Sequence, residues 1–391
     1  MKVYMGNKKR SNFFFLVYLA GLSVIGFLAT DMYLPAFDKM RIDLDTSKNN
    51  ISASLTLFLA GYAIAQLLWG PFADKIGKPR SILVGLGIFT VASLSIFFTY
   101  DVTVLLVLRL LQAIGVCAAA VSWQALVIER YPADKTNKVF ATIMPLVALS
   151  PALAPLLGVF LLDYFGWRSI FIVLAIIALL MMFYTLTLRE EAARGNQAIP
   201  KKGASYIQLL QSKTYVGNVM IYAVCSGAFF AWLTGSPFFL KELGYDEAQI
   251  GFSFVPQTVA FMLGGYGYRA LSDRMQGRRI LPFLLVLYSV AVIGVLAITL
   301  ITPPTLVMLL IPFCLMALAN GACYPIVVAQ AMKLFPGSLG KASALQNALQ
   351  LGTCFLASGI VSLFSNTALL TTALVMVGTI PFVIIGFRMS K

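Results

Sequence analysis

Long apolar runs separated by short polar stretches dominate the chain, and this pattern predicts membrane-spanning helices. A span needs about 20 mostly apolar residues to cross a hydrocarbon core about 30 Å thick. The 391-residue chain supplies twelve such runs, so we expect an all-α membrane protein with twelve transmembrane helices. The expected spans are 13–38, 50–73, 80–99, 102–127, 138–162, 167–188, 214–240, 247–270, 280–300, 305–330, 341–364 and 367–388.

A polar stretch near the middle divides these spans into two pseudo-symmetric six-helix halves. We expect an N-terminal half at 1–188, a cytoplasmic central loop at 189–213 and a C-terminal half at 214–391. Between its second and third spans, the first half carries GPFADKIGKPR and the second half carries YRALSDRMQGRR. Asp74 and Asp273 in these two segments lie 199 residues apart. Such an internal repeat of six helices is typical of secondary transporters.

Composition and charge support the membrane assignment. The chain is 60% hydrophobic and 11% charged, whereas soluble domains carry about 25% charged residues. The net charge is +14, and most Lys and Arg residues fall in every second gap between spans. That alternation is the positive-inside bias, so we expect both termini in the cytoplasm and no nucleic-acid partner. With no His and five Cys without metal-ligand spacing, we expect neither a metal site nor a cofactor.

Two charged residues fall deep inside apolar runs. Asp31 lies in FLATDMYLPAF and Arg109 in RLLQAIG, and both are expected at a similar depth below the outer surface. Because a charge in the membrane is costly and marks a functional site by default, we expect the two to pair and Asp31 to carry the coupled proton. The alternative is a salt bridge that only fixes two helices. Gln112, one turn after Arg109, shares its helical face.

The segment GPFADKIGKPR is expected to act as a conformational latch. Gly70 allows close approach of helices and Gly77 allows a tight turn, while Asp74 can pair with a basic residue or a helix end in one conformational state only. The latch residues are therefore expected to be Gly70, Asp74, Gly77, Arg80 and, in the second half, Asp273.

Several motifs resemble those of a known family. The pattern G-x-x-x-D-K-x-G-K-P-R resembles the signature loop of the major facilitator superfamily, and RLLQAIG is similar to its Arg-x-x-Gln-Gly motif. TDMYLPA resembles the start of the Bcr/CflA drug-resistance transporters. Five further segments, LVALSPALAPLLG, FFAWLTGSPF, VPQTVAFMLGGYG, NGACYPIVVAQA and ALQNALQLG, resemble bacterial purine nucleoside transporters.

This resemblance implies a proton-coupled transporter of purine nucleosides (adenosine, inosine or guanosine) that works by alternating access. It implies a monomer in the bacterial inner membrane, with the proton gradient as its energy source. The alternative is a multidrug/proton antiporter of the Bcr/CflA type. LSPALAPLLG, which contains Pro151, Pro155 and Gly158, resembles the drug exporters' antiporter motif, but Ser150-Pro151 stands where that motif has Gly-Pro.

A binding site for a nucleoside needs an aromatic ring that stacks on the base, and amides that hydrogen-bond to the edges of the base and to the sugar. Asn and Gln form paired hydrogen bonds with adenine, and stacking of a base on an aromatic ring contributes about 1–3 kcal/mol. Amides can also merely tie neighbouring helices together, and lone aromatics such as Phe261 and Trp167 are expected to face lipid or to belong to the aromatic belt at the membrane surface. The substrate-binding candidates are Asp31, Tyr33, Arg109, Gln112, Trp123, Gln124, Tyr222, Phe229, Phe230, Trp232, Gln257, Asn320, Tyr324, Gln346, Asn347 and Gln350.

Two other classes of protein are disfavoured. A membrane receptor would need a soluble output domain, and no segment between the expected spans is long enough for one. A membrane enzyme would need a nucleophile with a base, or a metal cluster, within reach of substrate. With no His and a single expected buried acid, we find no such group and expect no enzymatic activity.

Overall fold

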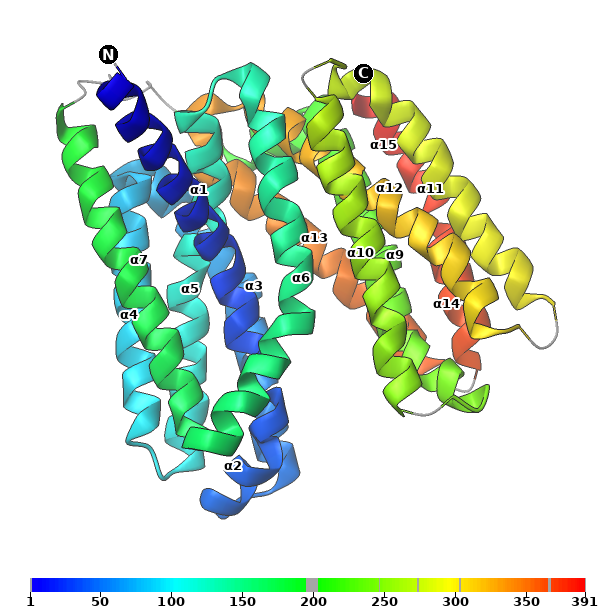
Figure 1. Cartoon of the computed structure of the whole chain (residues 1–391), viewed down its shortest axis with the longest axis horizontal. Coiled ribbons are helices and arrows are strands. Elements are labelled where there is room, and N and C mark those ends of the chain that lie inside the picture. The colour runs from blue at the N-terminus through cyan, green and yellow to red at the C-terminus, as the bar shows by residue number, and fades with distance from the viewer. Residues whose placement is uncertain are drawn as a thin grey trace. The chain divides into compact units, whose positions relative to one another are not determined.

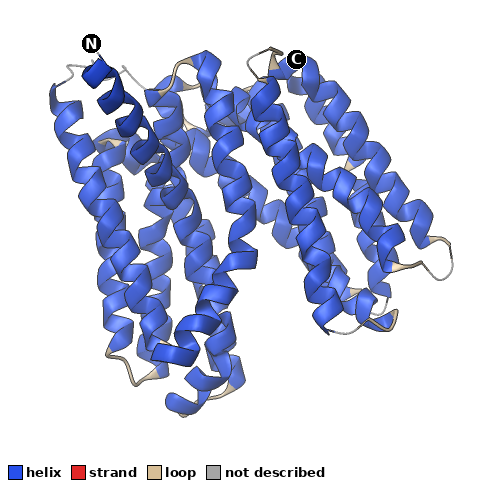
Figure 2. Ribbon diagram, viewed as in Figure 1, coloured by secondary structure: helices blue, strands red, loops and turns tan. Residues whose placement is uncertain are grey.

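The computed structural model describes residues 2–194, 203–245, 247–272, 274–301, 304–364 and 367–390, and the regular structure in these ranges is helical (Figures 1 and 2). This agrees with the expected all-α class. The elements are α1 (Lys2–Asp31), η1 (Leu34–Ala36), α2 (Phe37–Asp43), α3 (Lys48–Ile76), α4 (Lys78–Phe97), α5 (Val102–Arg130), α6 (Ala133–Phe165), α7 (Arg168–Arg194), α8 (Tyr206–Gln211), α9 (Lys213–Glu242), α10 (Glu247–Leu271), α11 (Gly277–Thr299), α12 (Leu306–Lys333), η2 (Pro336–Ser338), α13 (Leu339–Leu363), α14 (Ala368–Gly378) and α15 (Ile380–Ser390).

The helices match the expected spans, with two differences in detail. Within the described ranges, ten helical segments are long and apolar enough to cross a membrane. The expected spans 138–162 and 247–270 are also helical and form α6 and α10. The first span does not run to residue 38 as one α-helix, because α1 ends at Asp31 and a 3₁₀ turn with Pro35 near its start follows. The last span is divided into α14 and α15 at Thr379.

The chain forms two compact units, each of which contains a short piece from the other half of the sequence. Unit 1 comprises Met1–Arg130, Leu149–Ala204 and Gly337–Leu345. Unit 2 comprises Tyr131–Ala148, Ser205–Pro336 and Gln346–Lys391. The beginning of α6 therefore belongs to unit 2, and the beginning of α13 belongs to unit 1.

The two units repeat one packing scheme. In unit 1, α5 packs against α1, α3 and α4, and α7 packs against α1 and α4. In unit 2, α12 packs in the same way against α9, α10 and α11, and α14 packs against α9 and α11. Two halves of a sequence that repeat one six-helix unit are expected to form the same set of helix contacts. The observed correspondence therefore agrees with the internal repeat.

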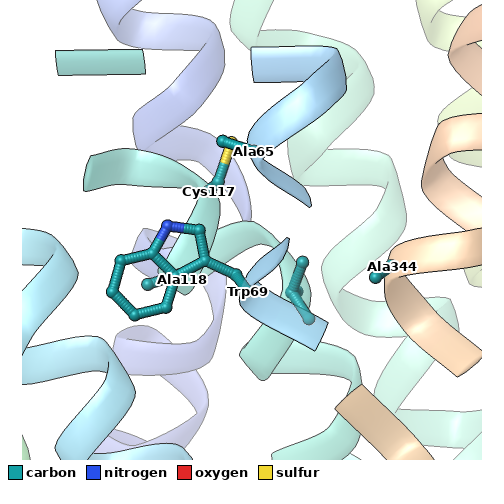
Figure 3. Packing of buried hydrophobic residues seen from close by; sticks show 6 residues of the cluster. Ala65, Trp69, Cys117, Ala118 and Ala344 are labelled. Atoms are coloured by element: carbon teal, nitrogen blue, oxygen red, sulfur yellow. The ribbon is translucent and has the colours of Figure 1, made fainter. Parts of the chain in front are cut away.

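Small residues let the helices of unit 1 approach closely. A Cβ atom at Gly85 would lie only 2.5 Å from the carbonyl oxygen of Gly115, so α4 and α5 pack backbone to backbone. Beside this contact, a buried cluster joins Trp69 and Cys117 to the beginning of α13 through Ala344 (Figure 3). Because lipid provides no hydrophobic drive between helices, such close van der Waals contact is a main source of their association.

Candidate functional site

Asp31 lies at the C-terminal end of α1 rather than inside a continuous helix. Proline has no backbone N–H and disfavours α-helical backbone in the residue before it, so Pro35 stops α1 from continuing. The carboxylate is partly buried. The carbonyl oxygen of Leu28 still accepts from the Met32 N–H at 3.1 Å, but the carbonyl groups that follow it at the end of α1 lack intrahelical donors and therefore need other partners.

Arg109 on α5 supplies one of these partners and is itself fully buried. Its Nη2 donates to the carbonyl oxygen of Ala29 at 3.1 Å, which places a cation at the negative end of the α1 dipole. The guanidinium carbon lies 4.1 Å from the ring centre of Tyr33 and 4.4 Å from that of Phe58. Phe171 lies farther away, at 5.8 Å. Aromatic faces attract such a cation, most strongly where water is absent.

The expected ion pair between Asp31 and Arg109 is not formed: no ion pair within 4 Å joins these two described residues. The physical reason is the rotation of α1. Asp31 follows Ala29 by two positions, or about 200° around a helix of 3.6 residues per turn. Arg109 meets the Ala29 side of the helix, and a carbonyl, an amide and aromatic rings stabilise its charge in place of the carboxylate.

Gln112 continues the polar contacts from Arg109 toward α4. Arg109 Nη1 donates to Gln112 Oε1 at 2.8 Å, and Gln112 Nε2 donates to Ser93 Oγ at 2.6 Å. Ser93 Oγ then donates to the carbonyl oxygen of Phe89 at 2.7 Å. Arg109 and Gln112 are both fully buried, so the network connects α1, α5 and α4 within the interior of unit 1.

Gly158 holds the backbone just after Asp31. A Cβ atom at Gly158 on α6 would collide with the carbonyl oxygen of Met32. This glycine comes from LSPALAPLLG, so that segment packs directly on the turn that ends α1. Tyr33 in the same turn is fully buried, and its hydroxyl lies 3.2 Å from Ser54 Oγ on α3.

In unit 2, aromatic candidates on α9 and α12 lie against each other. The rings of Tyr222 and Tyr324 are 4.9 Å apart and perpendicular, and Ser226 Oγ donates to the Tyr324 hydroxyl at 3.2 Å. Phe261 on α10 completes the group at 5.6 Å from Tyr324. Phe261 is buried rather than lipid-facing, so the expectation for it is wrong.

A second aromatic group lies farther along α9. Trp232 is fully buried and stacks on Phe313 with ring centres 4.1 Å apart and an interplanar angle of 14°. Phe229 stacks on the same ring at 5.7 Å and contacts Phe230 edge to face. The indole N–H of Trp232 has no hydrogen-bond partner among the described residues.

The amide candidates of unit 2 lie on α10, on α12 and on α13. Gln257 and Asn320 are 1% exposed, and their side-chain carbonyl oxygens have no partner in the described structure. Asn320 is anchored through Nδ2, which donates to the carbonyl oxygen of Cys225 at 3.3 Å. Gln346 is fully buried on α13, whereas Asn347 and Gln350 are partly buried on the same helix.

The two remaining candidates of unit 1 lie on α5. Trp123 is 6% exposed. Gln124 is 2% exposed, and its Oε1 accepts a hydrogen bond from Ser343 Oγ on α13 at 2.8 Å. Gln124 thereby joins α5 to the beginning of α13.

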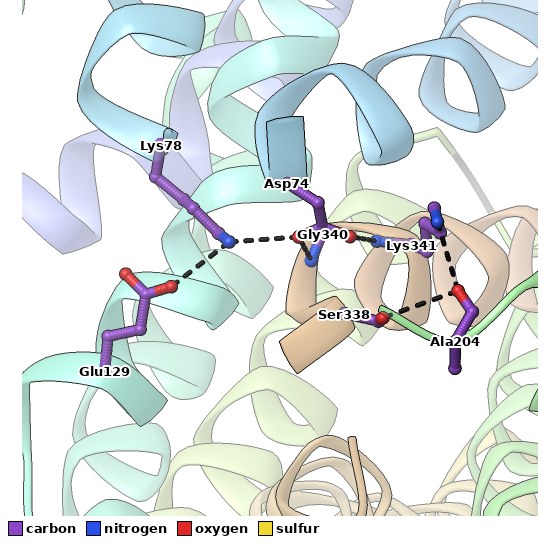
Figure 4. Close-up of polar contacts among 7 residues, drawn as sticks. All are labelled: Asp74, Lys78, Glu129, Ala204, Ser338, Gly340 and Lys341. Carbon is purple, nitrogen blue, oxygen red and sulfur yellow. Dashed lines mark hydrogen bonds and ion pairs between the residues drawn. The ribbon is translucent and has the colours of Figure 1, made fainter. Parts of the chain in front are cut away.

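Asp74 at the end of α3 caps the N-terminus of α13 (Figure 4). Its Oδ1 accepts from the Gly340 backbone N–H at 2.8 Å and its Oδ2 from that of Lys341 at 3.0 Å. Both N–H groups belong to the first helical turn, where no intrahelical acceptor exists and where the dipole favours an anion. Asp74 also pairs with Lys78 at 3.0 Å, and Lys78 pairs with Glu129 at 3.1 Å.

The other residues of the GPFADKIGKPR segment have distinct places. A Cβ atom at Gly340 would lie 2.5 Å from the carbonyl oxygen of Gly70, so α3 and α13 touch there. Gly77 has φ of +90° and ends α3, as the tight turn requires. Arg80 is exposed, and Lys78 rather than Arg80 pairs with Asp74. Asp273 lies outside the described residues.

Sequence reasoning missed several participants in these contacts. Phe58 on α3 and Phe171 on α7 lie around Arg109, and Ser93 on α4 accepts from its neighbour Gln112. Single apolar or hydroxyl residues give no signal of such a role in the sequence. Trp167 was expected to face lipid or to belong to the aromatic belt; it lies directly before α7, is 3% exposed, and its indole N–H donates to Asp43 at 2.8 Å. Among the described residues, no group of His, Cys, Asp and Glu has the arrangement of a metal site.

Comparisons with known proteins agree with this architecture. The chain is 26% identical over 96% of its length to an uncharacterized MFS-type transporter, YdgK, from Bacillus subtilis, and covers 95% of it. It is 29% identical to a bicyclomycin resistance protein homolog from Haemophilus influenzae, over 66% of this chain and 67% of that protein. Multidrug resistance protein D of Escherichia coli is 25% identical over 90% of this chain and 89% of its own length.

The same fold occurs in a solved structure. A crystal structure of the transporter FucP in the outward conformation superposes with a TM-score of 0.72 at 14% identity, covering 96% of this chain and 98% of that one. The sequence model described as Major Facilitator Superfamily matches residues 19–358, which is most of the chain. The chain therefore belongs to the Major Facilitator Superfamily, a family of membrane transporters and not of enzymes.

Proposed function

We propose that the protein is a proton-coupled secondary transporter of small organic molecules with planar rings. It operates as a monomer in the bacterial inner membrane with both termini in the cytoplasm. The proton gradient is its energy source, and it requires no cofactor. The observation that carries this proposal is the buried Arg109, whose charge is held by the Ala29 carbonyl two residues before Asp31. Asp31 follows Ala29 by two residues on α1, so its carboxylate is the second acceptor that we assign to this cation.

Proton binding selects between these acceptors. When Asp31 is ionised it is a stronger acceptor for the guanidinium than a neutral carbonyl, so Arg109 moves from Ala29 toward Asp31. When Asp31 is protonated, Arg109 returns to the Ala29 carbonyl and to Gln112. The exchange moves α1 relative to α5, and a substrate that favours one arrangement is coupled to the proton by differential affinity.

The contact of Asp74 with α13 acts as the latch of the same cycle. It is formed by one carboxylate and two backbone N–H groups, so it exists only while the beginning of α13 stays in unit 1. Alternating access requires elements around the substrate site to separate and rejoin. The latch therefore stabilises one conformational state over the others.

Two substrate classes have support from different observations. The names of the curated relatives, which concern resistance to bicyclomycin and to multiple drugs, favour a drug/proton antiporter. The interior of unit 2 favours purine nucleosides, because Gln257 and Asn320 keep buried carbonyl oxygens without partners. An unpaired buried acceptor costs about 1–3 kcal/mol, and an exocyclic amine or a sugar hydroxyl would satisfy it. Tyr222 and Tyr324 supply aromatic rings for either class, whereas Trp232 is already stacked on Phe313.

One experiment tests both the coupling and the substrate class. The purified protein is reconstituted in proteoliposomes, and movement of labelled adenosine, inosine and a labelled drug such as chloramphenicol is followed with the proton gradient imposed in each direction. Purine nucleosides moving faster than pyrimidine nucleosides and drugs would support the nucleoside assignment. Faster movement of the drug would establish the antiporter, and gradient-independent movement of every compound would refute proton coupling.

Asp31→Asn supplies the internal control, because it mimics a permanently protonated acid. We expect this variant to bind substrate and to exchange it across the membrane, but not to accumulate it against a gradient. Accumulation at the wild-type rate by a folded Asp31→Asn protein would show that the carboxylate is structural and that the coupling site lies elsewhere.

A further inference from the structure

A polar cluster of unit 1 lies at the helix ends that the positive-inside pattern assigns to the outer surface. Asp43, the last residue of α2, accepts two hydrogen bonds on Oδ2, from the indole N–H of Trp167 at 2.8 Å and from Nη1 of Arg168 at 3.1 Å. Nη2 of Arg168 donates to the carbonyl oxygen of Thr99 at 3.1 Å. The cluster therefore joins the end of α2, the connection between α4 and α5, and the beginning of α7. We call Asp43, Trp167 and Arg168 the outer clamp.

The outer clamp has a fixed geometry although part of it meets solvent. Gly166 has φ of +76°, so the chain turns sharply just before Trp167. The guanidinium carbon of Arg168 lies 4.2 Å from the ring centre of Trp167 and 4.8 Å from that of Tyr100. The side chain of Arg168 is 20% exposed and that of Asp43 is 46% exposed. An exposed ion pair by itself contributes little to stability, but a planar guanidinium held between rings loses less freedom for each hydrogen bond it forms.

On α7, the outer clamp leads directly to the rings around Arg109. Phe171 follows Trp167 by four residues, and the two rings are perpendicular with their centres 6.1 Å apart. Phe171 is fully buried, and its ring centre lies 5.8 Å from the guanidinium carbon of Arg109. The same ring lies 6.0 Å from the ring of Tyr33. A displacement of the first turn of α7 would therefore move one of the rings beside the buried cation.

On the other side, α2 leads to Tyr33. The turn η1 and helix α2 follow Tyr33 without an intervening loop, and the rings of Tyr33 and Phe37 lie 5.1 Å apart. Met40 in the same helix is fully buried. The ring centre of Tyr33 lies 4.1 Å from the guanidinium carbon of Arg109. Both elements that Asp43 joins, α2 and α7, thus lead to rings that hold Arg109.

We propose that Asp43 is a positioning residue of the proton-coupling site. Its two hydrogen bonds cross-link α2 to α7 and so keep the rings of Tyr33 and Phe171 around Arg109. This inference deepens the proposed function and rests on it, because the movement of Arg109 is the step that we assign to proton coupling. When the outer clamp opens, the rings separate and release the guanidinium toward Asp31. A nearby cation favours the ionised carboxylate, so opening the clamp weakens proton binding by Asp31.

The test measures protonation of Asp31 without any transport. Dicyclohexylcarbodiimide reacts with protonated carboxyl groups in apolar surroundings, and mass spectrometry of the purified full chain quantifies the modified Asp31 across a pH series. Asp43→Asn should lower the pH of half-maximal labelling by about 0.5–1 unit, which corresponds to a proton affinity that is about three- to tenfold weaker. Trp167→Phe keeps a ring beside Phe171 but removes the N–H that binds Asp43, and it should shift the profile in the same direction.

The matched control is Asp163→Asn, which removes an exposed carboxylate from the end of α6 on the same surface. Salt screens such distant exposed charges, so this variant should leave the labelling profile of Asp31 unchanged. A second comparison uses Phe171→Leu, which removes the ring that connects the outer clamp to Arg109. In that background Asp43→Asn should cause no further shift, because the two substitutions interrupt one chain of contacts.

Two outcomes would overturn the proposal. The first is a wild-type labelling profile in folded Asp43→Asn and Trp167→Phe proteins. The second is full addition of the Asp43→Asn and Phe171→Leu shifts, which would show that the two residues act independently. The expected shifts in a protein that shows no proton-driven transport would support the positioning role of Asp43 and refute the proposed function, so the two failures are distinguishable.

Discussion

Replacing Asp74 with asparagine should release the beginning of α13 from unit 1. The carboxylate accepts two backbone hydrogen bonds, from Gly340 and Lys341. Asparagine has one acceptor oxygen, so at least one bond is lost and its NH₂ group faces a backbone N–H. Lys78 keeps Glu129 as a partner in the variant, so no cation is stranded.

The magnitude follows from the contacts that change. A hydrogen bond to a charged group contributes about 1.5–3 kcal/mol, and a charge near a helix N-terminus adds about 0.3–1 kcal/mol. We therefore expect a loss of about 2–3 kcal/mol, which shifts the equilibrium toward the uncapped state by about 30- to 150-fold. The fold and substrate binding should persist, while turnover slows because one state of the cycle is depleted.

Cysteine labelling measures this equilibrium directly. Ser343 is fully buried beside Gln124, so a cysteine placed there, in a chain lacking its five native cysteines, reacts with a maleimide only when the beginning of α13 separates. Asp74→Asn should raise the labelling rate by the same factor of about 30- to 150-fold.

The matched control is Asp101→Asn. Asp101 also caps a helix, since its Oδ1 accepts from the Val104 N–H at 2.9 Å, but it does so at the start of its own helix, α5. This variant should leave the labelling of position 343 unchanged. If Asp74→Asn labels no faster than Asp101→Asn, the carboxylate does not hold α13, and the residues from Gly70 to Arg80 form an ordinary loop.

Two further substitutions test the surroundings of Asp31. Arg109→Lys keeps the charge but loses the planar fork that reaches both Ala29 and Gln112; we expect proton-driven transport to fall at least tenfold, and wild-type transport would show that charge alone suffices. Gly158→Ala adds a methyl group against the Met32 carbonyl and should displace the turn after Asp31, lowering thermal stability by several degrees and weakening coupling. An unchanged melting temperature and coupling ratio for Gly158→Ala would mean that the turn is free to adjust.

The sequence alone established the class, the repeat and the local motifs of this protein. Apolar runs of about 20 residues predict helices that cross the bilayer, because a chain of this length cannot bury so much apolar surface away from water in a soluble fold. Relations within one helix were equally predictable. Arg109 and Gln112 are three residues apart, so helix periodicity places them on one face, and they do hydrogen-bond. The positive φ of Gly77 follows from a turn that only glycine accommodates easily.

The tertiary structure decided which groups on different helices meet. Equal depth in the membrane indicated that Asp31 and Arg109 could pair, but the rotation of α1 turns the Ala29 carbonyl toward the guanidinium instead. The contact of Gln124 with Ser343 on α13 was likewise not visible in the sequence. Phe261 and Trp167 are buried for the same reason. Each of these contacts depends on how two helices are rotated and where they cross. Close packing of many side chains that are distant in sequence determines this geometry, and the residue spacing along a single helix does not encode it.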